Sequence, residues 1–459
     1  MTAMNTSRFH NEQGSVFITV VVAASILGIV GGAILSYLSN EYNLNVRGHG
    51  WNQSLHLAES AVEIGFAELN YQNFFGANGF QSARGWASGG VAGSYVKSVT
   101  NFSDNTGALI GSLTITVSGL SGLNPQILGV GTYNCPRGSN VTRAVQVNTS
   151  KVSQFPVAMM SKNRMDMNGN KIYTDSFDST DVSKSTNGQY DAAKRQANGN
   201  VASKGTIVDS LNIGNAEIYG VAYTGVGGTV TIGAQGSVGP SFTQRDTTLA
   251  QALADGFVQS DFNVDVPDAV LPAGAGSWSY VGTGGGISKD TTLTSGDYRT
   301  GGISLINNSK KDTLTINGNV RLYVDGNVSL SGISQIIISS NSSLTVYVSG
   351  SVSLTGNGII NQNGTAQKDV WYGLTSSTSW TIAGNGYFTG AIYAPSATVS
   401  VKGGGSSGDF NGSIVANNIT LTGQVKIHYD EALRQANTGA GYMVCSWTEM
   451  RNVNGAWVP

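Results

Sequence analysis

Charged residues are scarce in this chain of 459 residues. Asp, Glu, Lys and Arg together make up 11% of it, against about a quarter of a typical globular domain. The formal net charge is −2, so the sequence has no basic footprint for nucleic acid. Eight prolines are too few for a collagen or a proline-rich linker, and the 62 glycines follow no Gly-X-Y period. What remains is rich in Ser, Thr, Asn, Val and Ile, which is typical of many short strands joined by turns.

Cysteine and histidine are also scarce. The two cysteines, Cys135 and Cys445, allow one intrachain disulfide at most. The four histidines form no cluster with the spacing of zinc ligands, either with each other or with the cysteines. The sequence therefore gives no reason to expect a cofactor.

The N-terminal region carries the longest apolar stretch. Residues 16–35 are almost all apolar, and residues 15–40 carry no charge, which is enough for one helix across a bilayer. Small residues recur there at every fourth position, at Ala24, Gly28, Gly32 and Ser36. On a helix they form a stripe where a neighbouring helix can approach closely, although small residues are common in such spans in any case.

A second helical pattern follows the apolar stretch. Apolar residues are spaced by three or four positions, at Trp51, Leu55, Ala58, Val62, Phe66 and Leu69. Gly48 and Gly50 lie between the two patterns, and we expect them to bend or loosen the join. The sequence therefore predicts a membrane helix that runs into a soluble stalk helix.

The segments "NEQGSVFITVVVAASILG" (11–28) and "LHLAESAVEIGFAELN" (55–70) resemble the start of type IV pilin-like proteins. The large minor pilins (PilX-like) and the large minor pseudopilin of type II secretion are the most similar types. The resemblance implies cleavage of a leader after Gly14, with Ser15 as the new N-terminus. It also implies a bacterial membrane protein with a cytoplasmic N-terminus, and other pilin or pseudopilin subunits as partners. Thr19 stands where most pilins have Glu, a departure that resembles subunits at a fibre tip.

Export places the rest of the chain in an oxidising space, where disulfides persist. We therefore expect Cys135 and Cys445 to pair and to tie the C-terminal tail to the domain that follows the stalk. The alternative is two unpaired buried cysteines.

Short alternating runs occupy the region after the stalk. They are separated by Gly, Asn and Pro, as in an antiparallel sheet, and read "SYVKSVT", "SLTITVSG", "PQILGVGTY" and "VTRAVQVN". The sequence predicts a small pilin-like β domain over 71–153.

A short motif recurs from residue 157 onward: apolar, polar, apolar, then Gly. Examples are "VSLSG" at 328, "VSLTG" at 352 and "ITLTG" at 419. A second motif precedes several copies, starting at 322, 346, 371, 392 and 414, so its spacings are 24, 25, 21 and 22 residues. Such a period predicts a parallel β-helix over 154–430. A propeller blade needs about twice this length, and a β-sandwich predicts no repeated motif.

One longer segment occurs twice, as "YDAAKRQAN" (190–198) and "YDEALRQAN" (429–437). We expect short helices there and at "DTTLAQALADG" (246–256). They would cover the β-helix, and residues 431–459 would form a C-terminal cover helix and tail that closes its last coil.

Four tyrosines share one position of successive repeats: Tyr323, Tyr347, Tyr372 and Tyr393. Their neighbours are mostly aliphatic, so strand alternation predicts that the rings stack in a row outside the coil. The default role of such a row is structural, and an exposed row is also a surface on which polysaccharide could bind.

Candidate catalytic groups are few. In residues 320–422 the charged residues do not fall at matching repeat positions: Arg321, Asp325, Lys368, Asp369, Lys402 and Asp409. "HYDE" brings together His428, Asp430 and Glu431, which we interpret as a structural helix start. "GGSSG" (404–408) has the sequence pattern of a nucleophile elbow, G-x-S-x-G. Gly403, Gly405 and Gly408 have the spacing of a dinucleotide-binding loop, G-x-G-x-x-G. Neither motif has the flanking strand and helix that its function requires.

Three aspartates lie close together on a predicted loop: Asp175, Asp178 and Asp181. Calcium is the metal that this cluster would suit, although its spacing is not that of an EF-hand. The default is a solvated turn.

We therefore expect a mainly β chain with a leader (1–14), a membrane and stalk helix (15–70), a β domain and a β-helix. The expected function is that of an exported, membrane-anchored structural or adhesive subunit of a pilus or pseudopilus, not an enzyme. Two alternatives stay open. One is a membrane-tethered β-helix enzyme acting on polysaccharide, and the other is a solenoid that polymerises end to end.

Overall fold

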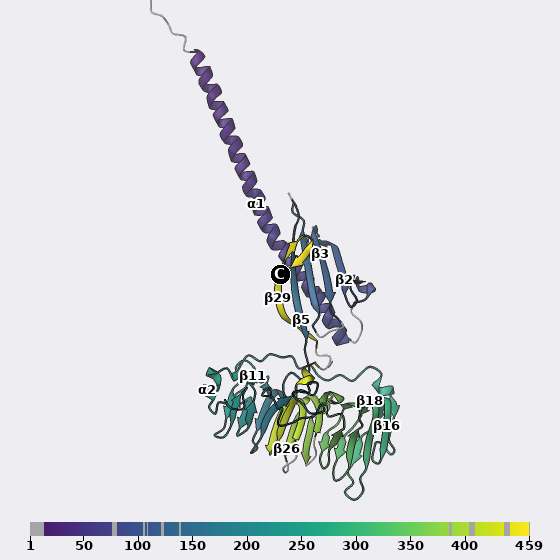
Figure 1. The fold of residues 1–459 in the computed structure, drawn as a ribbon. Helices are drawn as coiled ribbons and strands as arrows, with labels where there is room; N and C mark the ends of the chain where they lie inside the picture. The colour runs from purple at the N-terminus through teal and green to yellow at the C-terminus, as the bar shows by residue number, and fades with distance from the viewer. Residues whose placement is uncertain are drawn as a thin grey trace, which may run out of the picture. The chain divides into compact units, whose positions relative to one another are not determined.

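The computed structural model describes residues 13–75, 80–103, 106–107, 109–120, 124–136, 139–384, 388–403, 409–435 and 441–458. The chain divides into two compact units (Figure 1). The first contains residues 1–151 together with 441–459, and the second contains residues 152–440.

The first unit begins with one long helix, α1 (Gln13–Phe75), of 63 residues. Its N-terminal part is apolar and exposed along its length, and by length and composition it is able to cross a membrane. The expected break at Gly48 and Gly50 is absent, because α1 runs through both without interruption. Gly50 is instead buried where a side chain would meet Cys135 Sγ, so this glycine allows close packing.

An antiparallel sheet follows α1, as the sequence predicts, and it packs on the second half of the helix. Its strand order is β1-β2-β3-β4-β5-β29-β30. The strands are β1 (Ala87–Ser88), β2 (Tyr95–Ser103), β3 (Leu109–Ser118), β4 (Gln126–Tyr133), β5 (Val141–Lys151), β29 (Tyr442–Val453) and β30 (Ala456–Val458). A short 3-10 helix, η1 (Ser82–Arg84), precedes β1. The shared core contains Leu57, Ala61 and Leu69 of α1 and Ile115 and Ile127 of the sheet.

The C-terminal tail differs from the expected cover. Residues 442–453 form strand β29, which pairs antiparallel with β5 of the first unit. The predicted cover helix is limited to a 3-10 turn, η4 (Glu431–Gln435). The tail is therefore an edge of the antiparallel sheet, and backbone pairing holds it there.

The second unit is made of short strands, and every named strand pair described in it is parallel. Its first strands are β6 (Met159–Met167), β7 (Tyr173–Phe177), β8 (Val201–Ser203), β9 (Leu211–Gly214), β10 (Glu217–Tyr219), β11 (Ala222–Thr224), β12 (Val230–Ile232), β13 (Ser237–Gly239) and β14 (Val258–Gln259). The next are β15 (Ser279–Tyr280), β16 (Thr291–Thr300), β17 (Ile303–Leu305), β18 (Thr313–Val324), β19 (Val328–Leu330), β20 (Gln335–Ile338), β21 (Ser343–Val348), β22 (Val352–Leu354) and β23 (Ile359–Asn361). The last are β24 (Asp369–Gly373), β25 (Ser379–Gly384), β26 (Phe388–Gly403), β27 (Asp409–Gly423) and β28 (Lys426–Asp430).

Three short helices interrupt these strands in addition to η4. They are α2 (Leu249–Ala254), η2 (Ala275–Ser277) and η3 (Ala366–Lys368). Helix α2 lies where the sequence predicts one, and the side chain of Thr248 caps it by accepting a hydrogen bond from Gln251 N. Residues 190–198 form turns rather than the predicted helix.

The sequence repeat determines which strands pair. Tyr323 lies opposite Tyr347, and Tyr347 lies opposite Tyr372 on the next strand. In most copies the outer residues are buried and the middle residue is not, as at Val328, Ser329 and Leu330. The exceptions are Ile232 and Ile382, outer residues that are only half-buried. Each repeat therefore rests on its neighbour in register, with aliphatic side chains on the buried face.

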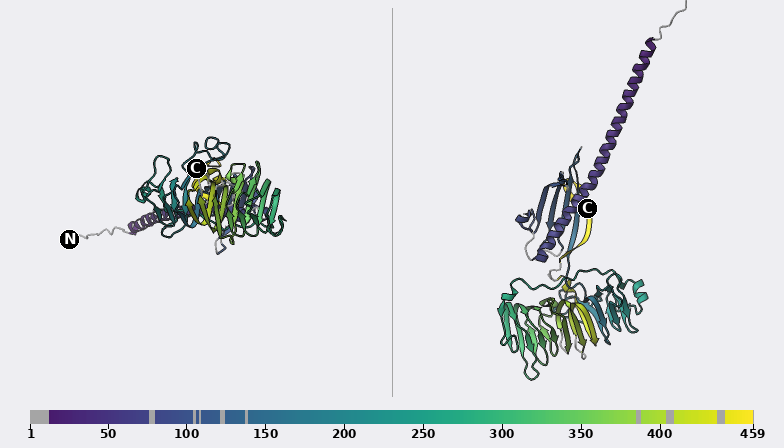
Figure 2. Two further views of the ribbon diagram at one scale, coloured as in Figure 1. Left: turned by 90° about the horizontal axis from the view of Figure 1, so that it is seen from below. Right: turned by 180° about the vertical axis from the view of Figure 1, so that it is seen from behind.

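The order of the repeats in space differs from their order in the chain. The first strand, β6, pairs with β27 on one side and with β8 and β9 on the other. The chain builds one stack up to β14, crosses over through residues 260–278, and builds a second stack from β15 back to β28 (Figures 1 and 2). Residues 429–435 consequently lie beside the first repeat, not at an open end of the unit.

Candidate functional site

The tyrosine row exists in the predicted register. Tyr347 and Tyr372 stack with ring centroids 5.1 Å apart, and Tyr372 meets Tyr393 edge-on at 6.1 Å. The neighbours Leu322, Val346 and Trp371 are buried in the core. Strand alternation therefore places the tyrosine rings on the strand face opposite these neighbours.

The row is not the exposed surface that the sequence analysis expects. Tyr393 is only 1% exposed, and its hydroxyl donates a hydrogen bond to Pro267 O at 2.6 Å. Farther along, Trp278 packs edge-on against Tyr347 at 6.4 Å. Both contacts come from the crossover segment 260–278, which runs over the tyrosines because it must connect the two ends of the unit. A binding surface on this row is therefore limited to the partly exposed Tyr323, Tyr347 and Tyr372.

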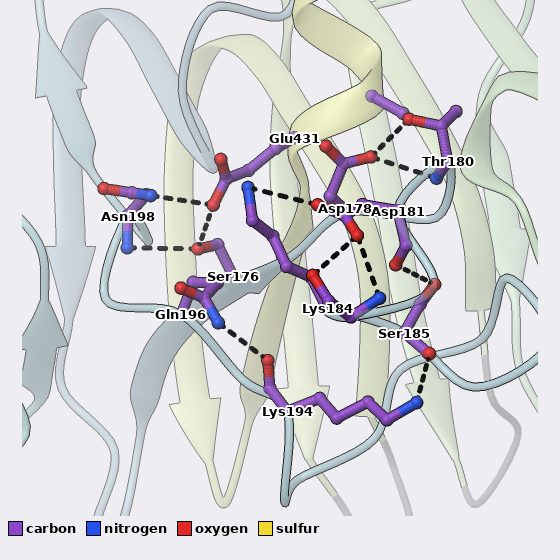
Figure 3. Close-up of polar contacts among 12 residues, drawn as sticks. Ser176, Asp178, Thr180, Asp181, Lys184, Ser185, Lys194, Gln196, Asn198 and Glu431 are labelled. Atoms are coloured by element: carbon purple, nitrogen blue, oxygen red, sulfur yellow. Dashed lines mark hydrogen bonds and ion pairs between the residues drawn. The ribbon is translucent and has the colours of Figure 1, made fainter.

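The three aspartates proposed for calcium do not converge. Asp178 accepts hydrogen bonds from the backbone and hydroxyl of Thr180, and Asp181 accepts the equivalent pair from Ser183 (Figure 3). Asp175 is buried elsewhere, against His428. The described residues contain no group of three His, Cys, Asp or Glu side chains that could hold a metal ion. Asp178 and Asp181 stabilise turns, whereas Asp175 pairs with His428.

Asp175 and His428 form a buried ion pair. Both side chains are 0% exposed, and His428 Nδ1 lies 2.5 Å from Asp175 Oδ1. The two residues face each other on β7 and β28. On the other side of the imidazole, Nε2 lies 3.8 Å from Asp409 Oδ2, an ion-pair distance too long for a hydrogen bond. The imidazole is thus held between two carboxylates.

Aromatic rings and cations surround this histidine. The ring of Tyr190 stacks on His428 with centroids 3.6 Å apart, and its hydroxyl donates to Asp175 Oδ2 at 2.8 Å. Tyr173 meets the imidazole edge-on. Arg195 lies 3.8 Å from Asp175 Oδ2, and Lys426 Nζ lies 3.5 Å from Asp409 Oδ1. Two carboxylates therefore face three basic side chains.

These contacts shift the protonation equilibria. Burial acts to lower the pKa of His428, but Asp175 and Asp409 outweigh it, and the net pKa is raised. Burial acts to raise the pKa of Asp409, but the charges of His428 and Lys426 outweigh it, and the net pKa is lowered. Burial and the charges of Asp175 and Asp409 raise the pKa of Tyr173 to about 12. The cluster therefore favours an imidazolium paired with two carboxylates.

An open polar cleft of ≈ 730 Å³ lies beside the cluster. Asp409 and Tyr190 line it together with Thr389 and six amide side chains. The amides belong to Gln189, Gln335, Asn357, Asn361, Gln362 and Asn411. The arrangement can hydrogen-bond a polar ligand, with Asp409 and the imidazolium behind it as the charged groups nearest to that ligand.

The motif "HYDE" has mixed roles. Asp430 is buried and accepts hydrogen bonds from the backbone N–H groups of Ser179, Ala366 and Ala432. Glu431 accepts hydrogen bonds from Ser176 and Asn198 (Figure 3). These two side chains stabilise the meeting of the first and last repeats, which agrees with the structural interpretation of the motif. Asp409 shares no repeat position with the other charged residues in the sequence, and the pairing of β27 with β28 brings it next to His428.

The two cysteines do not form the predicted disulfide. Both are free, with Cys135 half-buried and Cys445 exposed. Cys135 follows Tyr133, which lies opposite Val141 at the start of β5, whereas Cys445 lies at the bulge opposite Asn148 and Thr149. Seven residues of strand separate these positions, about 23 Å at ~3.3 Å per residue. A disulfide needs Cα atoms within about 7 Å.

Other predicted features lie on α1 or outside the described residues. Gly14 and Ser15 belong to the first turns of α1, and the rest of the leader, 1–12, is outside the described residues. So are residues 404–408 of the "GGSSG" loop. Side chains added at Gly28 or Gly32 would meet nothing within 4 Å, so the small-residue stripe is unoccupied in the described chain.

Comparisons with known proteins give limited similarity. Residues 272–436, less than half of the chain, match a domain of unknown function, DUF7305. No curated protein matches the chain in sequence.

Two solved structures are similar at low scores. The competence-associated pilin ComZ from Thermus thermophilus has a TM-score of 0.30 and 14% identity, covering 87% of this chain and 97% of that chain. The DUF3494 domain of a Shewanella frigidimarina ice-binding protein has a TM-score of 0.25 and 13% identity, covering 60% of this chain and 95% of that chain. Scores this low assign neither fold nor family. Among the described residues, one helix is long and apolar enough to cross a membrane, which fits a membrane anchor.

Proposed function

We propose that this chain is an exported, membrane-anchored structural or adhesive subunit of a type IV pilus or a type II secretion pseudopilus-like assembly. Its N-terminus faces the cytoplasm, and its β units lie in the periplasm or outside the cell. Its partners are other pilin or pseudopilin subunits.

The observation that carries this proposal is the division of α1 into two functional halves. The N-terminal half is apolar and exposed, with an 18-residue window of mean hydropathy 2.5 that is 0% buried. The C-terminal half buries Leu57, Ala58 and Ala61 against the antiparallel sheet. One continuous helix thus supplies both a membrane segment and the core of a folded domain.

The sheet is adapted to this helix. A Cβ atom added at Gly129 would lie 2.3 Å from Ala58 O, and one added at Gly131 would lie 2.4 Å from Ala58 N. Glycine at these two positions of β4 lets the strand approach the helix backbone closely. Such packing keeps the sheet fixed on the stalk while the apolar half is free to contact lipid or other subunits.

Three further features support the assembly proposal. The polar leader ends at Gly14, directly before the apolar run that starts at Val16. The stripe of Ala24, Gly28 and Gly32 is exposed and available to a neighbouring helix. Thr19 lacks the carboxylate usual at this position of pilins, which agrees with a place at the fibre tip and with a PilX-like type.

We also propose that the second unit is a parallel β-helix that the pilus-like subunit displays. The parallel in-register pairing of strands spaced by 21 to 25 residues supports this architecture. Stacked Ser, Thr and Tyr positions avoid the repulsion that stacked like charges would cause at about 4.8 Å.

The test combines fibre fractionation with analysis of the N-terminus. Cells that express the chain with its secretion or pilus machinery are sheared, and the fibre fraction is probed for the chain. We expect it to be enriched there, with Ser15 as its N-terminus by mass spectrometry. Gly14→Val should abolish processing and enrichment, whereas Ser7→Ala in the same leader should leave both intact. A chain that is absent from the fibres, or uncleaved, contradicts the proposal.

A membrane-tethered enzyme acting on polysaccharide is the second candidate. The location of Asp409 in the wall of a polar cleft, next to a buried imidazole, favours it. Polysaccharides incubated with the purified chain should then release reducing ends, and Asp409→Asn should stop the release. Absence of any release would leave the structural function as the sole proposal.

A further inference from the structure

We propose that the cleft bordered by Tyr190, Asp409 and Asn411 is a binding site for a short, neutral oligosaccharide. The inference rests on the proposed function for one point only, the location of the cleft outside the cytoplasm, where it would meet glycans. The binding chemistry itself follows from the lining of the cleft.

The lining is dominated by uncharged groups that donate and accept hydrogen bonds. Six residues with amide side chains and Thr389 border this one space, beside the apolar side chains of Ile359 and Ile360. An amide offers two donors and a carbonyl acceptor, which match the hydroxyl groups of a sugar, each of which is both donor and acceptor. A volume of ≈ 730 Å³ is within the range of small-ligand pockets. The cleft therefore has the polarity and the size for a few sugar rings.

Several polar atoms at the cleft have no hydrogen-bond partner among the described residues. Asn411 donates through Nδ2 to Thr389 Oγ1, but its Oδ1 is buried and accepts nothing. Asp409 Oδ1 has only the ion pair with Lys426, and His428 Nε2 makes no hydrogen bond although its side chain is fully buried. Buried polar groups without partners are costly. Asp409 and Asn411 line the cleft, so a ligand hydroxyl bound there is the nearest group that would supply the missing partner, whereas His428 lies behind Asp409 and does not border the cleft.

The charges select against other ligands. An acidic sugar or a phosphate would meet the carboxylate of Asp409, whose pKa is lowered, in the wall of the site. A metal ion lacks a set of three ligands in the part of the chain that the structure describes. Asp409 already pairs with Lys426 and His428, so a cationic ligand would compete with two internal partners. A neutral ligand that donates hydroxyl groups fits best.

The site is also held in place before any ligand binds. Thr389, Asn411 and His428 are consecutive partners in register on β26, β27 and β28. Tyr190 is fixed by stacking on His428 and by its bond to Asp175, and the rest of its ring gives the cleft an apolar wall. Groups on paired strands lose little freedom on binding, which favours affinity.

A glycan array of neutral and acidic oligosaccharides, probed with the detergent-solubilised full chain, tests the inference. We expect neutral oligosaccharides to be retained. Gln362→Ala removes an exposed amide of the cleft, and Asn411→Leu removes the unpartnered acceptor. Each should weaken binding of the retained oligosaccharide by about threefold to tenfold, the effect of one lost hydrogen bond.

Gln235→Ala is the matched control, because Gln235 is an exposed amide on another repeat and does not line the cleft. It should leave the affinity unchanged. Retention of acidic oligosaccharides alone, retention of none, or affinity that neither cleft variant alters would overturn the inference. Fibre fractionation is independent of these results: a chain that binds glycans but is absent from sheared fibres refutes the proposed function and leaves the site standing.

Discussion

Asp175 and His428 lie 253 residues apart in the chain, yet their side chains form a fully buried ion pair at 2.5 Å. Asp175 belongs to β7, near the start of the second unit, and His428 belongs to β28, near its end. The pair therefore links the stack of repeats that ends at β14 to the stack that ends at β28. Tyr429 adds a second link between these regions, because its hydroxyl donates a hydrogen bond to Phe155 O at 2.7 Å.

Replacing this histidine should destabilise the second unit. His428→Gln leaves the carboxylate of Asp175 buried without its main partner, and removing one member of a buried pair costs about 3–5 kcal/mol. Urea unfolding of the detergent-solubilised chain measures the effect. Lys204→Gln serves as the control, because the partly exposed Lys204 pairs with the exposed Asp265, and its loss should change the unfolding midpoint little. Equal midpoints for the two variants would disprove the role of the pair.

The same histidine predicts a dependence of stability on pH. In the folded state Asp175 and Asp409 outweigh the effect of burial and raise the pKa of His428. The other aromatic and charged groups around this cluster are Tyr190, Tyr173, Arg195 and Lys426. The stabilisation is then fully present below the unfolded pKa, about 6.5, and is lost as pH rises through the raised folded pKa. The difference in unfolding free energy between the native chain and His428→Gln should shrink from pH 6 to pH 9. A difference that grows with pH would contradict the assignment.

Tyr393 should hold the crossover segment in place. Tyr393→Phe removes the donor of the hydrogen bond to Pro267 O. The carbonyl loses this hydrogen bond, which should lower the stability of the segment by about 1–3 kcal/mol. Hydrogen exchange should increase over residues 262–270. Tyr347→Phe is the control in the same row, because no hydrogen bond of its hydroxyl is present among the described residues. If both variants exchange alike, the hydroxyl of Tyr393 does not anchor the segment.

Gly131 should be essential to the first unit. In Gly131→Ala the new methyl group would lie 2.4 Å from Ala58 N, so helix and strand must separate and the core must open. We expect limited proteolysis to cut the first unit of this variant much faster than that of the native chain. Gly90→Ala adds the same methyl group where nothing lies within 4 Å, and it should be harmless. Unchanged protection of Gly131→Ala would show that the close approach is not required.

Both cysteines should react as thiols. Labelling of the denatured, unreduced chain is expected to modify Cys135 and Cys445 alike. In the folded chain the exposed Cys445 should react faster than the half-buried Cys135, which packs near Gly50. If the denatured chain takes up label only after reduction, the two cysteines are joined in a disulfide and this prediction is wrong.

The sequence by itself determined the local elements of this protein. The apolar run of 16–35, the alternating runs of the antiparallel sheet and the repeat spacing of 21 to 25 residues all correspond to observed helix, strands and register. These features depend on near neighbours in the chain, since side-chain alternation and the position of Gly are enough to specify a strand and its end. The alternation also placed the four tyrosines on the strand face opposite their buried neighbours, although it did not reveal that the crossover segment covers them.

Only the tertiary structure decided which distant segments meet. A strand edge accepts any strand of suitable register, so the sequence did not reveal that β6 lies between β27 and β8. That order alone brings Asp175 to His428, and it forces residues 260–278 across the tyrosine row. Asp409 reaches His428 through the pairing of the consecutive strands β27 and β28. The uninterrupted course of α1 through Gly50 and the separation of the two cysteines likewise depend on packing, because the contacts that fix them come from strands far away in the sequence.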